Sequence, residues 1–366
     1  MGACVEPYPP PSAVDNASFL VVDGFLNATT ESVSVKINHS VALNSSSPYP
    51  AEKGATVTIE DNNGESISLT EGDNGLYQAS EFPVDPAKTY KLHIVTSAGT
   101  SYSSDYVELR HVAEIDSVVW RPETTTSEPG TRFYVNTHDP TNSTSYYRFL
   151  FTETWEYRVE FVSDFKRDGV IPVYRPPSEQ VYTCWRTINS TAILTTSTKH
   201  LNTDVVSMYP IRFINRGSRM LSRLYSINVE QRAVSQEEYE YWNLVKKTTE
   251  NLGGLFDPLP SQVTGNVHND NDPGEQVLGY FSGGYTTTKR TFLAYSDLPG
   301  PLMTVDPWDF VCEVKTIPIT NFDLVGDLVY LQSQGIPPTA YSAAPAMCAD
   351  CTIMGGQNVK PSFWPY

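Results

Sequence analysis

The sequence is poor in positive charge and has no long apolar run. It contains 25 Lys and Arg residues against 42 Asp and Glu residues, so its formal net charge is −17. Nucleic-acid binding depends on basic clusters that neutralise phosphates, and the acidic balance therefore argues against it. The same balance disfavours adhesion to anionic lipid by charge alone. No stretch approaches the roughly 20 apolar residues that a membrane-spanning helix requires.

Short motifs of common catalytic sites are missing as well. No serine occupies a GxSxG sequence, and neither GxxxxGK[ST] nor GxGxxG occurs. The six histidines form neither an HExxH motif nor a close pair, so a histidine metal site is not expected. We therefore predict a protein that is not an enzyme and binds no cofactor. A hydrolase with dispersed carboxylates remains an alternative, because catalytic acids from distant strands leave no local motif.

Cysteine is scarce, and the first of the five stands near the start of the chain. The sequence opens Met1-Gly2-Ala3-Cys4, and two small residues before a cysteine resemble the end of a bacterial lipoprotein cleavage site. A proline-rich stretch follows, which is typical of a stiff, extended spacer. We predict that Cys4 carries a lipid anchor, that residues 1–17 are a tether, and that the signal peptide is absent from the printed sequence. The alternative is an ordinary cysteine in a disordered tail.

The other four cysteines form an even set, which suits an oxidising compartment. They are Cys184, Cys312, Cys348 and Cys351. Three pairings are possible, and we favour Cys348–Cys351 together with Cys184–Cys312. Two alternatives fit less well: a zinc site would need a second closely spaced cysteine pair, and a thioredoxin-like site would need the CxxC motif at a strand-to-helix turn.

Residues 18–110 alternate between apolar and polar side chains in short stretches separated by turn signals. Val33, Val35 and Ile37 show the period of two that is typical of a half-buried strand. Asn62-Asn63-Gly64 supplies a turn that tolerates positive φ. About seven such strands in roughly 90 residues predict an immunoglobulin-like or transthyretin-like β-sandwich. With 22 tyrosines and few charged residues, the whole chain is predicted to be mainly β.

A larger β-rich domain is predicted from residue 111 to residue 366. Two pairs of its strands are predicted at 209–215 with 224–231, and at 277–281 with 288–295 around Gly283-Gly284. A helix is possible near 322–334. The end of the chain, 347–366, is predicted to be an irregular tail that contains two of the cysteines.

One helix is predicted near residues 235–252 of this domain. Ser235 and Glu238 form a capping box, in which the serine hydroxyl accepts an orphan N–H and the Glu238 carboxylate reaches back. Three large side chains recur at helical spacing and indicate a face packed on the core: Tyr239, Trp242 and Val245. Gly253-Gly254 ends the helix.

One loop has the composition of a calcium site. Asp270, Asp272 and Glu275 supply hard oxygen ligands beside a glycine. The spacing is not that of an EF-hand loop, and an ordinary polar loop is the alternative; no other metal site is predicted. Aromatic clusters such as Tyr146-Tyr147 indicate core packing, with sugar binding as the alternative.

Several phrases, taken in their order and spacing, resemble one protein family. They include Cys4-Val5-Glu6-Pro7, Phe19-Leu20-Val21-Val22-Asp23-Gly24, Asn74-Gly75-Leu76-Tyr77, Gly265-Asn266, Val277-Leu278-Gly279-Tyr280-Phe281 and Lys360-Pro361-Ser362-Phe363-Trp364. The family is a group of uncharacterised outer-membrane lipoproteins of Bacteroidota, described as domain of unknown function 4249. The resemblance covers nearly the whole chain.

This resemblance implies a location and a partner. It implies lipidation of Cys4, an outer-membrane location, and a TonB-dependent receptor as partner, because genes of the family often neighbour those of such receptors. It implies no catalytic residue. Surface-exposed lipoproteins of this group often carry an acidic run after the cysteine, whereas only Glu6 is present here. Whether the anchor lies at the cell surface or on the periplasmic face is therefore open.

We accordingly expect a lipid-anchored accessory or substrate-capture protein that acts with a TonB-dependent receptor in nutrient uptake or receptor assembly. The alternatives are a stand-alone surface lipoprotein that binds glycans or peptides, and the hydrolase with dispersed carboxylates. A large apolar patch at one pole would favour a protein partner. A groove with exposed aromatic rings would favour a glycan, and a deep pocket with perturbed carboxyl pKa values would favour the hydrolase.

Overall fold

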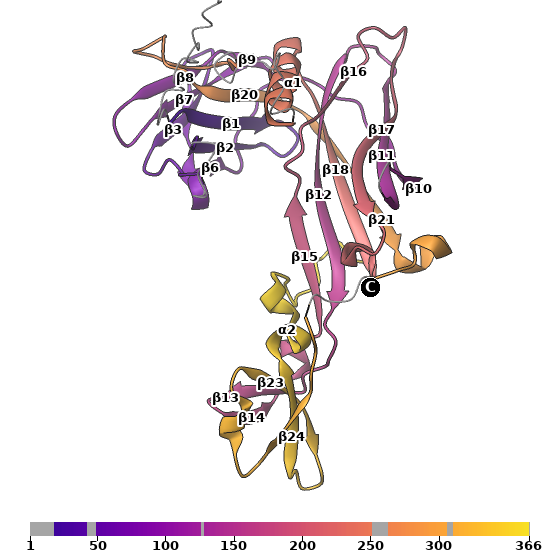
Figure 1. Cartoon of the computed structure of the whole chain (residues 1–366). Helices are drawn as coiled ribbons and strands as arrows, with labels where there is room; N and C mark the ends of the chain where they lie inside the picture. Colours follow the sequence, from indigo (N-terminus) through magenta and orange to yellow (C-terminus); the bar gives the residue numbers. More distant parts are fainter. Residues whose placement is uncertain (1–17, 42–48, 126–127, 251–262, 306–309, 366) are drawn as a thin grey trace, which may run out of the picture.

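The protein is an elongated molecule in which three β-rich bodies follow one another (Figure 1). A computed structural model describes residues 18–41, 49–125, 128–250, 263–305 and 310–365. A sandwich lies at one end, two long-stranded sheets form the middle body, and a smaller distal module lies at the other end. The prediction of a mainly-β fold is confirmed.

The sandwich contains eleven of the described strands. They are β1 (Leu20–Asn27), β2 (Ser32–His39), β3 (Thr56–Asp61), β4 (Ser66–Ser68), β5 (Thr70–Glu71), β6 (Leu76–Ala79), β7 (Thr89–Val95), β8 (Ser101–Ser104), β9 (Val107–Glu108), β19 (Val267–Asn269) and β20 (Leu278–Gly284). One sheet has the order β20-β1-β2-β6-β5, and the other has the order β19-β8-β7-β3-β4, with β9 paired to β7. Alternate side chains such as Ile37 and Leu92 fill the core between the sheets, as the period of two predicts.

Two strands from far along the chain complete this sandwich. β19 pairs with β8, and β20 runs parallel to β1. Glycine permits the close approach, because a Cβ on Gly279 would lie 2.8 Å from the Cβ of Val22. Residues 18–110 therefore do not form both sheets by themselves. The predicted hairpin around Gly283-Gly284 is wrong, since β20 pairs in the sandwich whereas β21 (Thr286–Ala294) pairs in the middle body.

The middle body consists of two sheets packed face to face. Besides β21 it contains β10 (Ile115–Thr124), β11 (Pro129–Asp139), β12 (Tyr146–Arg158), β15 (Thr183–Asn189), β16 (Leu194–Ser197), β17 (Asp204–Asn215) and β18 (Leu224–Ala233). One sheet has the order β10-β11-β17; the other has the order β15-β12-β18-β21, with β16 also paired to β12. Phe133 of the first sheet meets Tyr225 of the second in the core, with ring centres 5.2 Å apart.

The predicted pairing of residues 209–215 with 224–231 is wrong. Strand β17 pairs with β11, whereas β18 pairs with β12 and β21 in the opposite sheet. The connection between β17 and β18 therefore crosses from one sheet to the other. Strand periodicity reports which side chains are buried, but it does not report which strand is the neighbour.

The predicted helix is α1 (Gln236–Glu250), which lies where the sandwich meets the middle body (Figure 1). Ser235 caps it, because its hydroxyl accepts the backbone N–H of Glu238 at 3.0 Å. The second half of the capping box is wrong: the Glu238 carboxylate accepts the indole N–H of Trp242 instead. Gly253-Gly254, the predicted end of the helix, lies outside the described residues.

The distal module has a small core of its own. Its elements are β13 (Phe165–Asp168), β14 (Ile171–Tyr174), β22 (Lys315–Pro318), β23 (Leu328–Gln334), β24 (Ala340–Pro345) and α2 (Ala346–Ala349). The rings of Phe165, Tyr330 and Tyr341 pack together with centre distances of 5.0 and 5.7 Å. The predicted helix near 322–334 is wrong: a 3₁₀ turn ends at Val325, and the following segment, which contains the strand-favouring Val329 and Tyr330, forms β23 against β24.

All four cysteines of the described residues form disulfides, as predicted, but the favoured pairing is wrong. The bonds join Cys184 to Cys351 and Cys312 to Cys348, each with a Cα–Cα distance of 5.7 Å. Cys348 belongs to α2 and faces the distal module, whereas Cys351 follows α2 and faces β15 of the middle body. A short CxxC spacing therefore connects two different bodies and does not close on itself.

Candidate functional site

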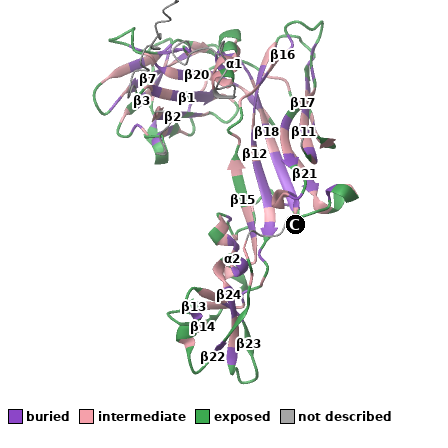
Figure 2. Ribbon diagram, in the orientation of Figure 1, coloured by how far each residue is buried: buried purple, intermediate pink, exposed green. Residues whose placement is uncertain are grey.

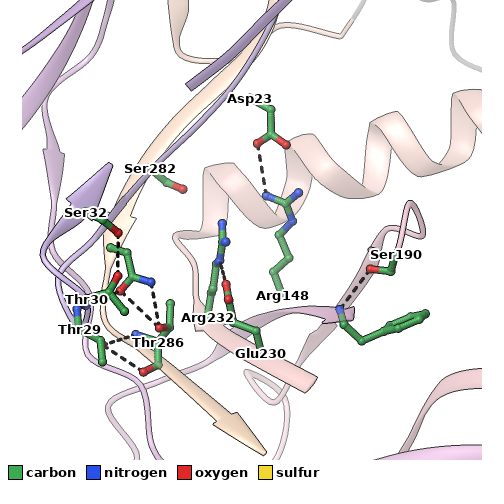
Figure 3. A network of polar contacts seen from close by, with 12 residues as sticks. Asp23, Thr29, Thr30, Ser32, Arg148, Ser190, Glu230, Arg232, Ser282 and Thr286 are labelled. Atoms are coloured by element: carbon green, nitrogen blue, oxygen red, sulfur yellow. Dashed lines mark hydrogen bonds and ion pairs between the residues drawn. The ribbon is translucent and has the colours of Figure 1, made fainter. Parts of the chain in front are cut away.

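A cluster of charged side chains lies where the sandwich, α1 and the middle body meet; Arg148 and Glu238 in it are buried, whereas Asp23 is half exposed. Figure 3 shows the contact between Asp23 and Arg148. Arg148 of β12 lies 3.9 Å from a carboxylate oxygen of Asp23 on β1, and 3.9 Å from one of Glu238 on α1. The guanidinium carbon of Arg148 also lies 3.6 Å from the centre of the Trp242 ring. Three elements from distant parts of the sequence therefore share one cation. We call Asp23, Arg148, Glu238 and Trp242 the junction cluster.

The carboxylate of Glu238 is almost completely enclosed, with 4% of its side chain exposed. Its Oε1 accepts hydrogen bonds from Trp242 Nε1 at 3.1 Å and from Ser282 Oγ at 3.2 Å. Burial raises the pKa of Glu238, and the charge of Arg148 offsets part of that rise. Burial also lowers the pKa of Arg148. Loss of either partner would leave the other charge buried and poorly compensated, which is strongly destabilising.

A second set of contacts holds the same junction (Figure 3). The guanidinium carbon of Arg232 on β18 lies 3.6 Å from the ring centre of Phe25 on β1. The hydroxyl of Thr29 donates to the carbonyl of Thr286 at 3.0 Å and accepts its N–H at 2.8 Å. Only Tyr285 separates β20 from β21. Both the chain and the side chains therefore fix the sandwich to the middle body.

A hollow of about 550 Å³ opens beside the junction cluster. Its lining includes Asp105, Arg110, Glu237 and Glu238. Hydrogen bonds from its own backbone N–H and from Ser235 lower the pKa of Glu237, whereas burial raises that of Glu238. Two carboxyl groups with opposite shifts are typical of acid–base pairs. In this protein the contacts of Glu238 with other side chains also account for its position without any catalytic role.

The predicted calcium residues do not converge on one point. Asp270 accepts a hydrogen bond from Ser101, Glu275 accepts one from the hydroxyl of Tyr102 at 2.7 Å, and Asp272 accepts a backbone N–H within its own turn. Within the described ranges, no three Asp, Glu, His or Cys side chains form a group that could hold a metal ion. The calcium prediction is therefore not supported, and two of the three carboxylates instead secure the edge formed by β8 and β19.

The predicted lipidation site lies outside the described residues. Cys4 and the rest of the predicted tether, 1–17, precede the first described position, Ser18. Across the part of the chain that is described, no helix is long and apolar enough to cross a membrane.

The far end of the molecule exposes apolar side chains. Ile336, in the turn between β23 and β24, is fully exposed, and Ile171, Tyr174 and Leu324 expose more than half of their surface. We call these and their exposed apolar neighbours in the module the distal surface: Val170, Ile171, Val173, Tyr174, Ile319, Leu324 and Ile336. Figure 2 shows exposed residues over much of this module. Seven exposed apolar side chains in so small a module make it the candidate interaction region of the molecule.

Sequence patterns did not indicate the junction cluster or the distal surface. The alternation in β12 shows that Arg148 lies in a strand, but it does not show that β1 and α1 approach that strand. One signal was present in the helix: Glu238 and Trp242 are four residues apart and therefore lie on one face. The distal surface gave no signal, because its residues come from segments that are separated by about 150 positions.

The comparison with protein families gives one match. A family model described as Domain of unknown function (DUF4249) matches residues 5–290. This range includes the sandwich, α1 and nearly all of the middle body, and it ends before β22. Among curated proteins, no match to the chain was found.

Proposed function

Because the chain belongs to the DUF4249 family, we propose that it is a lipid-anchored accessory protein of the outer membrane that acts with a TonB-dependent receptor. In this role it assists nutrient uptake or receptor assembly by binding the receptor, and it is not itself an enzyme. The observation that carries the proposal is the distal surface, which lies at the opposite end of the molecule from the first strand.

The position of this surface suits an anchored protein. β1 lies in the sandwich, and the distal module lies at the other end of the middle body (Figure 1). An anchor on Cys4 would keep the sandwich near the membrane and let the distal surface project from it. Outer-membrane barrels carry long loops outside the bilayer, so a projecting surface can meet such a partner. The junction contacts hold the sandwich in place on the middle body.

The chemistry of the distal surface suits a protein partner. Charged groups lie beside some of its apolar side chains: Lys166 of β13 pairs with Val173 of β14, and its Nζ lies 2.6 Å from Oε2 of Glu179. An apolar centre with a polar rim is typical of protein–protein interfaces. The Cys312–Cys348 disulfide supports this surface, because it fastens the segment that precedes β22 to α2. A small module with few core residues needs such a covalent link.

Capture from native membranes tests the docking role. Full-length wild type and a Leu324→Asp/Ile336→Asp variant are used as baits. Binding of a partner would bury the two introduced aspartates, which disfavours an apolar interface. A matched control, Tyr49→Asp/Val359→Asp, changes two exposed apolar residues outside the distal module. The proposal expects the TonB-dependent receptor with wild type and control but not with the distal variant. Equal recovery with all three baits, or no receptor with any of them, contradicts it.

Membrane fractionation tests the anchor separately. Wild-type precursor is expected in the outer-membrane fraction, whereas Cys4→Ser is expected in the soluble fraction, since stable anchoring requires the acyl chains on that cysteine. If Cys4→Ser stays membrane-bound, Cys4 is not the anchor.

A hydrolase is the second candidate, and the opposite pKa shifts of Glu237 and Glu238 favour it. This candidate requires turnover of a glycan or peptide substrate by the purified protein, and loss of that turnover in Glu237→Gln. Turnover that Glu237→Gln abolishes while the fold persists would replace the accessory role with an enzymatic one.

A further inference from the structure

A second hollow, of about 630 Å³, lies at the end of the middle body that faces away from the sandwich. It occupies the outer face of the sheet β15-β12-β18-β21. Glu156 and Arg158 of β12 line it, together with their cross-strand partners Trp185 and Thr183 of β15. The residue between the two β12 positions, Tyr157, points to the opposite face and is buried in the core. The strand period thus places four polar or aromatic side chains on one outer patch.

Other segments form the sides of this hollow. Ser222 and Arg223 precede β18, Tyr295 and Ser296 follow β21, and Lys360 comes from the tail of the chain. The tail is held in place by the Cys184–Cys351 disulfide and by paired backbone hydrogen bonds between Trp185 and Gln357. The hollow is therefore built by five separate segments, of which one is secured covalently.

The charge of this hollow is opposite to that of the protein. Arg158, Arg223 and Lys360 line it together with one carboxylate, Glu156, in a chain whose net charge is −17. Arg158 and Arg223 both face Oε1 of Glu156, at 3.6 and 3.7 Å. These separations are too long for hydrogen bonds. Among the described residues, neither guanidinium donates a side-chain hydrogen bond. The N–H groups of both arginines can therefore bind the carboxylate of a ligand.

The remaining lining selects among anions. Glu156 lies beside the cations and repels a compact dianion such as phosphate. Its Oε2 accepts Trp364 Nε1 at 3.4 Å, and a carboxylate has further acceptor positions for ligand hydroxyl groups. The hydroxyls of Thr183, Ser222 and Ser296 add donors and acceptors, and Trp185 adds an aromatic surface that can cover the apolar face of a sugar ring. A ligand with one carboxylate and several hydroxyls satisfies all of these groups.

We propose that this hollow binds a carboxylated sugar, such as a hexuronic acid, with Arg158, Arg223 and Lys360 holding the carboxylate and Glu156 accepting the sugar hydroxyls. The inference concerns a ligand of this chain and goes beyond the docking role, so neither depends on the other. It identifies a site on the middle body that shares no residue with the junction cluster or the distal surface.

Isothermal titration of the full chain tests the proposal with digalacturonate as the probe. Its neutral counterpart, a galactose disaccharide, and acetate and phosphate serve as the comparison ligands. Arg158→Gln/Arg223→Gln is expected to weaken digalacturonate binding by about tenfold or more, since two charge-assisted contacts are lost. Arg121→Gln/Arg216→Gln, which removes the same charge at two exposed arginines outside the hollow, is expected to bind as wild type does.

A second variant guards against a folding defect. Lys360→Gln alters only the exposed tail residue and is expected to weaken binding by a smaller factor while the melting temperature is unchanged. Equal binding of the neutral disaccharide, equal binding of acetate or phosphate, no binding of digalacturonate to wild type, or equal weakening by the control pair would overturn the proposal.

Discussion

At the scale of single residues, Asp139 shows how one carboxylate can organise a loop. It ends β11 and accepts five hydrogen bonds: from the N–H and hydroxyl of Thr141, the N–H and hydroxyl of Ser143, and the N–H of Thr144. Burial acts to raise the pKa of Asp139, but these hydrogen bonds outweigh it and hold the pKa well below its ordinary value. The charged form is therefore the one that the fold stabilises.

The replacement Asp139→Asn tests this role. A folded pKa below the unfolded value adds stability above about pH 4, and that stability is lost as the pH falls through the folded value. We expect the variant to be less stable at pH 7 by about 1–3 kcal/mol, because an amide nitrogen would face N–H donors. We also expect its stability to fall less than that of wild type between pH 5 and pH 2. Urea unfolding at both pH values measures this; equal acid sensitivity of the two proteins would contradict it.

The junction cluster marks a limit of sequence analysis at this scale. The spacing from Ser235 to Glu238 predicted the helix start correctly, but it assigned the Glu238 carboxylate to the cap. That carboxylate binds Trp242 and lies near Arg148 because β12 passes beneath α1. The local pair with Trp242 could be expected from the helical spacing, whereas the contacts with Ser282 and Arg148 come from distant strands, about which a local motif contains no information.

At the scale of elements, the contact between Gly265 and β20 joins two distant segments. Asn266 donates to the carbonyl of Phe281 and accepts its N–H, both at 2.8 Å. A Cβ on Gly265 would lie 1.4 Å from the carbonyl oxygen of Gly279, so no other residue fits without a backbone shift. The absence of a side chain at Gly265 therefore lets the segment around it pack directly against the backbone of β20 at Gly279.

Gly265→Ala is therefore expected to destabilise the protein. Overpacking against a backbone carbonyl costs about 1–3 kcal/mol, and the severity of this overlap favours the upper end. Gly300→Ala is the control, because no atom lies within 4 Å of its Cβ position. Denaturant unfolding should show a lower midpoint for Gly265→Ala and an unchanged midpoint for Gly300→Ala. Equal midpoints in the two variants would show that the close contact is not a constraint.

The disulfides give a second prediction for the elements. Peptide mapping of the unreduced protein should yield Cys184 linked to Cys351 and Cys312 linked to Cys348. The sequence separations of 167 and 36 correspond to about 5 and about 4 kcal/mol of stabilisation from restricting the unfolded chain. A linked Cys348–Cys351 peptide would contradict this pairing.

The pairing of elements was the part of the fold that sequence could not supply. The alternation of Val33, Val35 and Ile37 predicted β2 correctly, since half-buried strands leave a period of two. The same patterns could not show that β20 enters the sandwich beside β1, because parallel pairing needs no local turn. The disulfide pairing failed for the same reason: proximity in sequence suggested Cys348–Cys351, whereas the fold separates their side chains.

At the scale of the whole molecule, the proposed docking role depends on how the three bodies are arranged. The junction fixes the sandwich to the middle body, and the distal module carries exposed apolar residues at the far end (Figure 1). The sequence predicted a sandwich at 18–110 followed by one larger β-rich domain at 111–366, but it could not predict that this part contains two separate bodies or how the bodies are arranged in space. The distal surface arises only when β14, the turn after Phe322 and the turn after β23 come together in one module.

Photo-crosslinking in native membranes tests the central claim most directly. A photoreactive amino acid replaces Ile336 on the distal surface, and the control replaces Tyr49, an exposed apolar residue of the sandwich. Crosslinked products are identified by mass spectrometry. The account predicts that the probe at position 336 forms a product with a TonB-dependent receptor and that the probe at position 49 does not. A receptor product that forms equally from both positions, or none from position 336, would contradict it.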